Sequence, residues 1–150
     1  MGSVLAARGV KPKCTFQQVF KSKWVYGCFS PYTGTSLVMT FDECNGKYFQ
    51  IFLDELSKAN PDTMIVLLLD NAKFHTCKGL LIPQNIRIIF QPPYSPELNP
   101  SEKVWWTMKR QFRNKSYKML DEVEEFIKKE VANLTVDAIK QICGYDYFFE

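Results

Sequence analysis

The chain has 150 residues, a length that fits one domain able to bury a sizeable hydrophobic core. Its composition, 46% hydrophobic and 15% aromatic, excludes an intrinsically disordered protein, and the chain has no apolar run of membrane-spanning length and no secretory leader. The five cysteines form no Cys-x-x-Cys pair and the net charge is only +3, so we expect a cytoplasmic protein without membrane contact, disulfide framework or zinc site.

The positive charge is concentrated in two segments that contain no acid, residues 1–41 and 103–120, whereas the region after them is acidic. Two basic segments of this kind could border one anionic ligand. For any single cation, an ordinary solvated side chain is the alternative. The cations are Arg8, Lys11, Lys13, Lys21 and Lys23 in the first segment, and Lys103, Lys109, Arg110, Arg113, Lys115 and Lys118 in the second.

The first half of the chain predicts an irregular start, a hairpin and a helix. Residues 1–22 show no period, and two β-rich runs over 24–30 and 35–41 are joined by Pro-Tyr-Thr-Gly, which supplies turn dihedrals. Over 45–59 the apolar residues recur at spacings of three and four, as on one face of an amphipathic helix.

Two apolar runs, over 64–69 and 86–90, predict strands. The first run is continuously apolar, which is typical of a strand that is covered on both faces. We therefore expect it to lie centrally in a sheet.

Three helices are predicted after the second of these strands. The first opens at Asn99 or Ser101 and places Trp105, Met108 and Phe112 on one face, and the others cover 120–132 and 135–142. A hairpin, a helix, two strands and then helices predict an α/β sheet layered with helices.

Two acids stand at the ends of these elements. Asp70 follows the strand of 64–69, and Glu102 lies in the first turn of the helix after a loop stiffened by four prolines. Ligands gather beyond the carboxyl ends of strands in open α/β sheets, so two carboxylates placed there could share a divalent metal ion. Asp70 could instead be an ordinary cap, and Glu102 could close a capping box with Asn99.

Other candidate residues are less specific. His75 is the only histidine of the chain, and a lone histidine is more often structural than a metal ligand. Ser95 lacks the glycine elbow of a serine hydrolase. Trp105 fits a core position, whereas Trp106 could stack on bases or pack.

Residues 69–75 read Leu-Asp-Asn-Ala-Lys-Phe-His, and residues 92–102 read Pro-Pro-Tyr-Ser-Pro-Glu-Leu-Asn-Pro-Ser-Glu. Together they resemble the catalytic core of mariner-type transposases and of their bacterial insertion-sequence relatives. The Arg-Gly-Val-Lys-Pro segment at 8–12, the hairpin and the helix of 45–59 follow in the family's order, so the resemblance covers most of the chain.

The resemblance implies an RNase H-like fold, with a mixed sheet flanked by helices. It makes Asp70 and Glu102 the second and third acids of the family's Asp-Asp-Glu triad, although the interval between them is slightly short for the family. The family's first acid lies on a strand just before the segment that corresponds to 8–12, and residues 1–41 contain no acid. We therefore expect residues 1–150 to be one partial catalytic domain without the first strand.

The family's enzymes cut DNA with water and then join the freed 3′-hydroxyl to target DNA. The resemblance implies that Asp70 and Glu102 hold Mg²⁺ or Mn²⁺, with two ions in the complete site. It also implies that Asn71, His75 and Asn99 lie beside these carboxylates. Cations of both acid-free segments would bind the double-stranded DNA of transposon ends and target, namely Arg8, Lys11, Lys13, Lys103, Lys109, Arg110 and Arg113.

Because the first acid is absent, we expect the chain alone to be inactive as an endonuclease and strand transferase. Its partner would be the missing amino-terminal part or an intact transposase, a homodimer is compatible with the resemblance, and the place of action would be the nucleoid. Two alternatives stay open. One is a non-catalytic transposase remnant that binds DNA or pairs with an intact transposase; the other is a different RNase H-like nuclease, which residues 92–96 disfavour.

Overall fold

The computed structural model describes residues 23–70, 78–93, 98–112, 117 and 119–145. Strands and helices follow one another along the chain in the order that the sequence predicts, with the hairpin first and three helices last. The elements are β1 (Trp24–Phe29), β2 (Ser36–Phe41), α1 (Gly46–Ala59), β3 (Ile65–Leu69), β4 (Ile86–Phe90), α2 (Ser101–Phe112), α3 (Leu120–Ala132) and α4 (Val136–Cys143).

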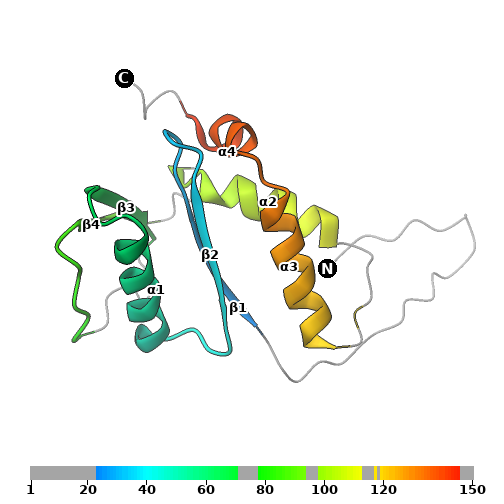
Figure 1. The fold of residues 1–150 in the computed structure, drawn as a ribbon, viewed down its shortest axis with the longest axis horizontal. Coiled ribbons are helices and arrows are strands. Elements are labelled where there is room, and N and C mark those ends of the chain that lie inside the picture. Colours follow the sequence, from blue (N-terminus) through cyan, green and yellow to red (C-terminus); the bar gives the residue numbers. More distant parts are fainter. Residues whose placement is uncertain (1–22, 71–77, 94–97, 113–116, 118, 146–150) are drawn as a thin grey trace, which may run out of the picture.

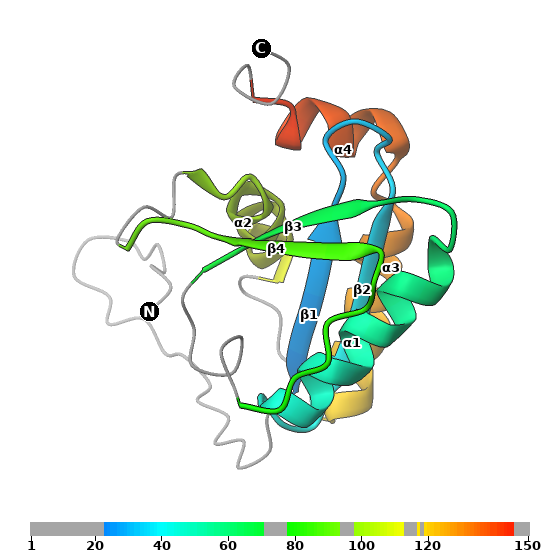
Figure 2. The ribbon, with the colours of Figure 1, turned by 90° about the vertical axis from the view of Figure 1, so that its left-hand side faces the viewer.

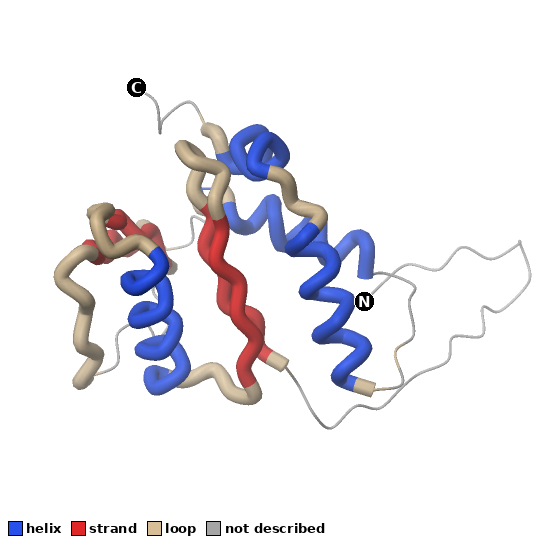
Figure 3. Tube along the Cα trace, in the orientation of Figure 1, coloured by secondary structure: helices blue, strands red, loops and turns tan. Residues whose placement is uncertain are grey.

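The β1–β2 hairpin lies at the centre of the molecule (Figure 1). Its strands are antiparallel, with Trp24 opposite Phe41 and Phe29 opposite Ser36, so the predicted hairpin is confirmed. Gly34 takes a positive φ of 71° in the turn, a conformation that glycine adopts without a steric penalty. Helices lie on both sides of the hairpin, with α1 on one side and α2, α3 and α4 on the other (Figure 3).

The first hydrophobic core lies between the hairpin, α1 and the β3–β4 pair. Strand residues alternate between the two faces of the hairpin, and Tyr26, Met39 and Phe41 point to this core. From α1, the fully buried Phe49 and Leu53 fill it, which confirms the predicted apolar face of that helix. Asn45 begins α1, because its side-chain oxygen accepts a hydrogen bond from the Tyr48 N–H at 3.1 Å.

Strands β3 and β4 pair in parallel, with Ile65 opposite Ile86 and Leu69 opposite Phe90. Figure 2 shows this pair crossing in front of the hairpin. Leu67 and Ile86 are buried toward the first core, but Val66 is 61% exposed and Ile89 is 52% exposed on the other face. The expectation that both faces of β3 are covered is therefore wrong: among the described residues, β3 pairs with β4 alone and packs on one face.

The second core lies on the opposite face of the hairpin, against α2 and α4. Phe29 meets Val104 and Met108 of α2 and the buried Ile139 and Cys143 of α4. Burial of these apolar side chains is what holds the C-terminal helices on the hairpin. None of the helices in the described part of the chain combines the length and apolar character that a membrane-spanning segment requires.

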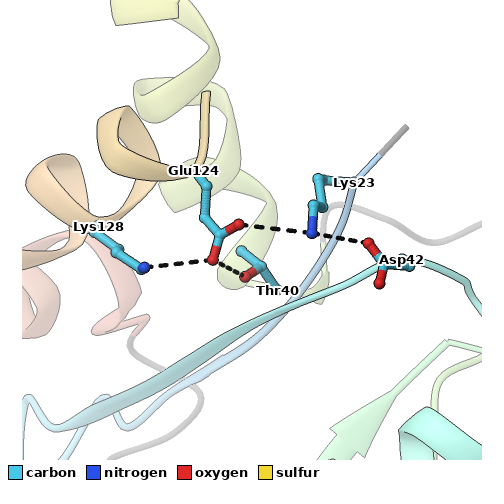
Figure 4. Close-up of polar contacts among 5 residues, drawn as sticks. All are labelled: Lys23, Thr40, Asp42, Glu124 and Lys128. Carbon is cyan, nitrogen blue, oxygen red and sulfur yellow. Dashed lines mark hydrogen bonds and ion pairs between the residues drawn. The ribbon is translucent and has the colours of Figure 1, made fainter. Parts of the chain in front are cut away.

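Helix α3 is attached to the hairpin by a polar network around Glu124 (Figure 4). The Thr40 hydroxyl donates a hydrogen bond of 3.1 Å to one carboxylate oxygen, and Lys128 lies 3.3 Å from the same oxygen. Lys23, at the start of β1, lies 3.6 Å from the other oxygen and 2.8 Å from Asp42. The network therefore joins the open end of the hairpin to α3.

Candidate active site

Asp70 stands directly after β3, at the carboxyl end of a strand that runs parallel to β4. The residue is exposed, in contrast to Leu67 and Leu69, which pack toward the first core. The alternative role of Asp70, as a cap of the segment after it, involves residues 71–77, which lie outside the described residues.

Glu102 lies in the first turn of α2. Asn99 sets the start of this helix, because its side-chain oxygen accepts a hydrogen bond of 3.0 Å from the Ser101 N–H and its carbonyl accepts one of 3.0 Å from the Glu102 N–H. This turn gives Asn99 the capping role that the sequence offered as an alternative. The reciprocal bond of a capping box, from the Asn99 N–H to the Glu102 carboxylate, is not formed within the described structure, and Glu102 is exposed.

The position of α2 depends on Trp105. Its ring meets Phe29 edge-on, with the centroids 5.5 Å apart. A Cβ at Gly27 would lie only 2.7 Å from the far edge of the Trp105 ring, so the absence of a side chain at Gly27 allows the ring to lie against β1. This contact holds the first two turns of α2, including Glu102, beside the hairpin. The predicted core role of Trp105 is confirmed.

Asp70, Asn99 and Glu102 line one cavity of about 270 Å³, together with Ser101. The rest of the lining comes from the first core, from Trp105 and from five consecutive residues of β1, Trp24 to Cys28. Consecutive residues of a strand point to alternate faces, so this pattern shows that the edge of β1 borders the cavity. Two acids that are distant in the sequence thus reach the same cavity from the end of β3 and the start of α2.

The oxygen donors of this cavity fit a hard divalent cation, since Mg²⁺ and Mn²⁺ prefer carboxylate and amide oxygens. Cys28 also lines the cavity, but burial raises the pKa of its thiol to about 11, so it stays protonated and is a poor metal ligand. In the described part of the chain, no group of three or more His, Cys, Asp or Glu side chains is placed to hold a metal ion. The cavity therefore provides two carboxylates but not a complete set of metal ligands.

The other predicted site residues divide into two groups. Lys103, Lys109 and Arg110 lie on α2, and all three are exposed. Arg8, Lys11, Lys13, Asn71, His75 and Arg113 lie outside the described residues.

Sequence reasoning missed the part that β1 plays in this cavity. Trp24 and Gly27 line the cavity although both of its acids, Asp70 and Glu102, are distant from them in the sequence. No periodicity or motif of one chain indicates which strand edge faces a distant helix. Ser101 could have been noticed, because it lies next to Glu102 in the motif.

A family model of the DDE superfamily endonucleases matches residues 3–124, which include both acids of the cavity and every strand of the described residues. The chain belongs to the DDE superfamily of endonucleases. It is also 33% identical over 102 residues to the "Uncharacterized protein y4pE/y4sA" of Sinorhizobium fredii (strain NBRC 101917 / NGR234), across 67% of this chain and 76% of that protein.

A solved structure shows the same fold. The chain superposes on the Mos1 transposase, in its paired-end complex with the left transposon end, with a TM-score of 0.71 and 17% sequence identity. The match covers 95% of this chain and 46% of the Mos1 chain, so this chain spans about half the length of that protein. The expected RNase H-like α/β fold is confirmed, and DDE enzymes generally use divalent metal ions.

Proposed function

We propose that this DDE domain is the carboxy-terminal part of a transposase catalytic domain, whose reaction is cleavage of DNA phosphodiester bonds followed by strand transfer. The observation that carries the proposal is that Asp70 and Glu102 line one cavity. The match to DDE superfamily endonucleases supports this type of chemistry.

In the proposed site, Asp70 and Glu102 would hold Mg²⁺ or Mn²⁺. Two such ions, when bound, stabilise the attacking and the leaving oxygens of an in-line displacement at phosphorus. Asn99 would contribute by setting the first turn of α2, which places Glu102 at the cavity. The apolar wall formed by Leu67, Leu69 and Phe52 would keep bulk water away from one side of the two carboxylates.

The proposed site needs a third acid, which residues 1–41 do not contain. We propose that a strand from outside these 150 residues supplies it, either from the amino-terminal part of the transposase or from a second polypeptide. Two carboxylates hold a divalent ion less tightly than three, so the chain alone would bind metal weakly and leave DNA uncut.

The partner in this proposal is double-stranded DNA, because the exposed Lys103, Lys109 and Arg110 extend from the turn that holds Glu102. Such cations bind phosphates without regard to sequence and bind them less well at high salt. A homodimer and a place of action in the nucleoid belong to the same proposal.

The test is cleavage of supercoiled plasmid in Mg²⁺, by the chain alone and by the chain mixed with a peptide that contains an apolar strand ending in Asp. We expect nicking only in the mixture, and none when the chain contains Asp70→Asn. Nicking by the chain alone that Asp70→Asn abolishes would show that the domain has a complete site. DNA binding without nicking in any mixture would favour the remnant hypothesis.

A further inference from the structure

Glu102, Trp106 and Arg110 follow one another at intervals of four residues in α2, so they lie along one face of that helix. All three are exposed, whereas Val104 and Met108 are buried against the hairpin. A line of exposed side chains therefore begins at the acid of the cavity and runs toward the C-terminal end of α2.

Trp106 is unusual on this face because 58% of its surface is exposed. The ring does not line the cavity, but it lies one helical turn beyond Glu102, which does, so a ligand that extends from the cavity along α2 would meet it. The guanidinium carbon of Arg110 lies 4.8 Å from the centroid of the Trp106 ring, within the range of a cation–π contact. Arg110 thereby restrains the ring, which lowers the entropy lost when a ligand binds to it.

The charges around Trp106 indicate a ligand that is both planar and anionic. Lys103 and Lys109 are exposed on the same helix, and no acid occurs between Glu102 and Asp121. A nucleotide combines a flat base, which stacks on an aromatic ring, with a phosphate, which binds cations. A protein partner would instead be expected to meet a broader apolar patch around the tryptophan.

The spacing relates this ring to the reacting strand. Four residues of helix correspond to about 6 Å along the axis, and successive nucleotides of one strand are about 3.4 Å apart along B-DNA. A strand that ran along α2 from a phosphate at Glu102 would therefore meet Trp106 one to two nucleotides away. Bases within a duplex already stack on their neighbours. Only a base that is unpaired or turned out of the helix offers its face to a side chain.

We propose that Trp106, restrained by Arg110, stacks on an unpaired base of the DNA strand beside Glu102, while Lys103 and Lys109 bind the phosphates next to that base. This inference rests on the proposed function, since it assumes that DNA enters the cavity. It assigns to Trp106 the recognition of a frayed or flipped base, a role distinct from the general attraction of the cations.

The test compares binding of the full chain to two labelled duplexes of equal length, one with flush ends and one with a short single-stranded 3′ overhang. Trp106→Ala is expected to weaken binding of the overhang DNA about tenfold and to change flush-end binding less than about twofold. Trp106→Phe should retain most of the overhang binding because it keeps an aromatic face. Tyr32→Ala, which removes an exposed aromatic side chain in the turn of the hairpin, serves as the matched control.

A third DNA, in which the overhang nucleotides lack their bases, separates stacking from phosphate contact. On this DNA, Trp106→Ala and the unaltered chain are expected to bind equally. The inference is wrong if Trp106→Ala binds all three DNAs as tightly as the unaltered chain does, or if the substitution weakens binding to all three by the same factor. A change of oligomeric state in Trp106→Ala, with unchanged DNA binding, would show that the ring contacts protein and would also overturn it. Failure of the unaltered chain to bind any of the DNAs would instead contradict the proposed function.

Discussion

Trp105 is the residue on which the position of Glu102 depends, and it also lines the cavity of the candidate site. The ring is held between Phe29 and the bare backbone of Gly27. The partly buried ring adds to the burial of Val104 and Met108, which keeps α2 against the hairpin. A shift of this ring would move the first turn of α2, and with it one of the two carboxylates of the cavity.

We expect Gly27→Ala to destabilise the domain by about 1–3 kcal/mol, because the new methyl group would overlap the edge of the Trp105 ring. Urea denaturation measures the loss. In the double variant Gly27→Ala/Trp105→Phe, the smaller ring no longer reaches the added methyl group, so the double variant should lose less stability than the two single losses together. Additive losses would show that Gly27 is needed for another reason.

Glu124 makes the free energy of unfolding depend on pH in the acid range. Its hydrogen bond from Thr40, together with Lys128, holds the pKa of the Glu124 carboxyl below its ordinary value of 4.5. A carboxyl with a lowered folded pKa stabilises the fold fully above its unfolded pKa, and the stabilisation is lost as the pH falls through the folded pKa. We therefore expect the free energy of unfolding to decrease as the pH falls below about 4.5, and this decrease to be smaller in Glu124→Gln.

Urea denaturation at a series of pH values measures this effect. Asp62→Asn, which alters an exposed acid in the turn before β3, is the control and should leave the acid dependence unchanged. An acid dependence that is identical in Glu124→Gln and in the unaltered chain would contradict the assignment.

At the scale of elements, the hairpin is the frame of the domain, since each of its faces carries a separate hydrophobic core. Its tip is also attached to α4. A Cβ at Gly34 would lie 2.5 Å from the carbonyl oxygen of Val136, the first residue of α4. The turn and α4 therefore pack with no space for a side chain between them.

We expect Gly34→Ala to cost more than about 1 kcal/mol, because the residue needs a positive φ and also meets the backbone of α4. Thermal unfolding measures the loss. Gly34→Asn separates the two causes, since asparagine tolerates the positive φ but still meets Val136. If Gly34→Asn is as stable as the unaltered chain, the contact with α4 is not tight.

Local elements were predictable from the sequence because their signals are local. The Pro-Tyr-Thr-Gly turn and the three-and-four spacing of 45–59 each specify a conformation within a few residues. The contact of Gly27 with Trp105 was not predictable, since nothing in either segment indicates the other. The apolar run of β3 was misread for a related reason: the run shows that both faces are apolar, but not that both are covered, and Val66 is exposed.

The candidate site was predicted in part. The motifs around Asp70 and Glu102 named both acids, and the structure places both at one cavity. The contribution of the β1 edge became visible only in three dimensions. Among the predicted DNA-binding residues, the structure places those on α2. Helical spacing did not decide whether Trp106 is buried, and the structure shows it exposed on the same helix.

At the scale of the whole molecule, two groups of elements meet at the cavity. The hairpin separates α1, β3 and β4 from α2, α3 and α4, and the first group contributes Asp70 whereas the second contributes Glu102 (Figure 1). A cation shared by these acids would join the two groups. Mg²⁺ or Mn²⁺ is therefore expected to raise the thermal unfolding temperature of the chain, because a ligand that binds only the folded state stabilises it.

The central claim is that Asp70 and Glu102 bind one metal ion. Its most direct test is a titration of the chain with Mn²⁺ in which the concentration of free Mn²⁺ is measured by electron paramagnetic resonance. If Asp70 and Glu102 share the ion, Asp70→Asn and Glu102→Gln should each weaken binding at least about tenfold, the double variant should be little worse than either, and Asp62→Asn should bind as the unaltered chain does. Binding that survives either substitution, or losses that simply add, would show that the two carboxylates do not hold a common metal ion.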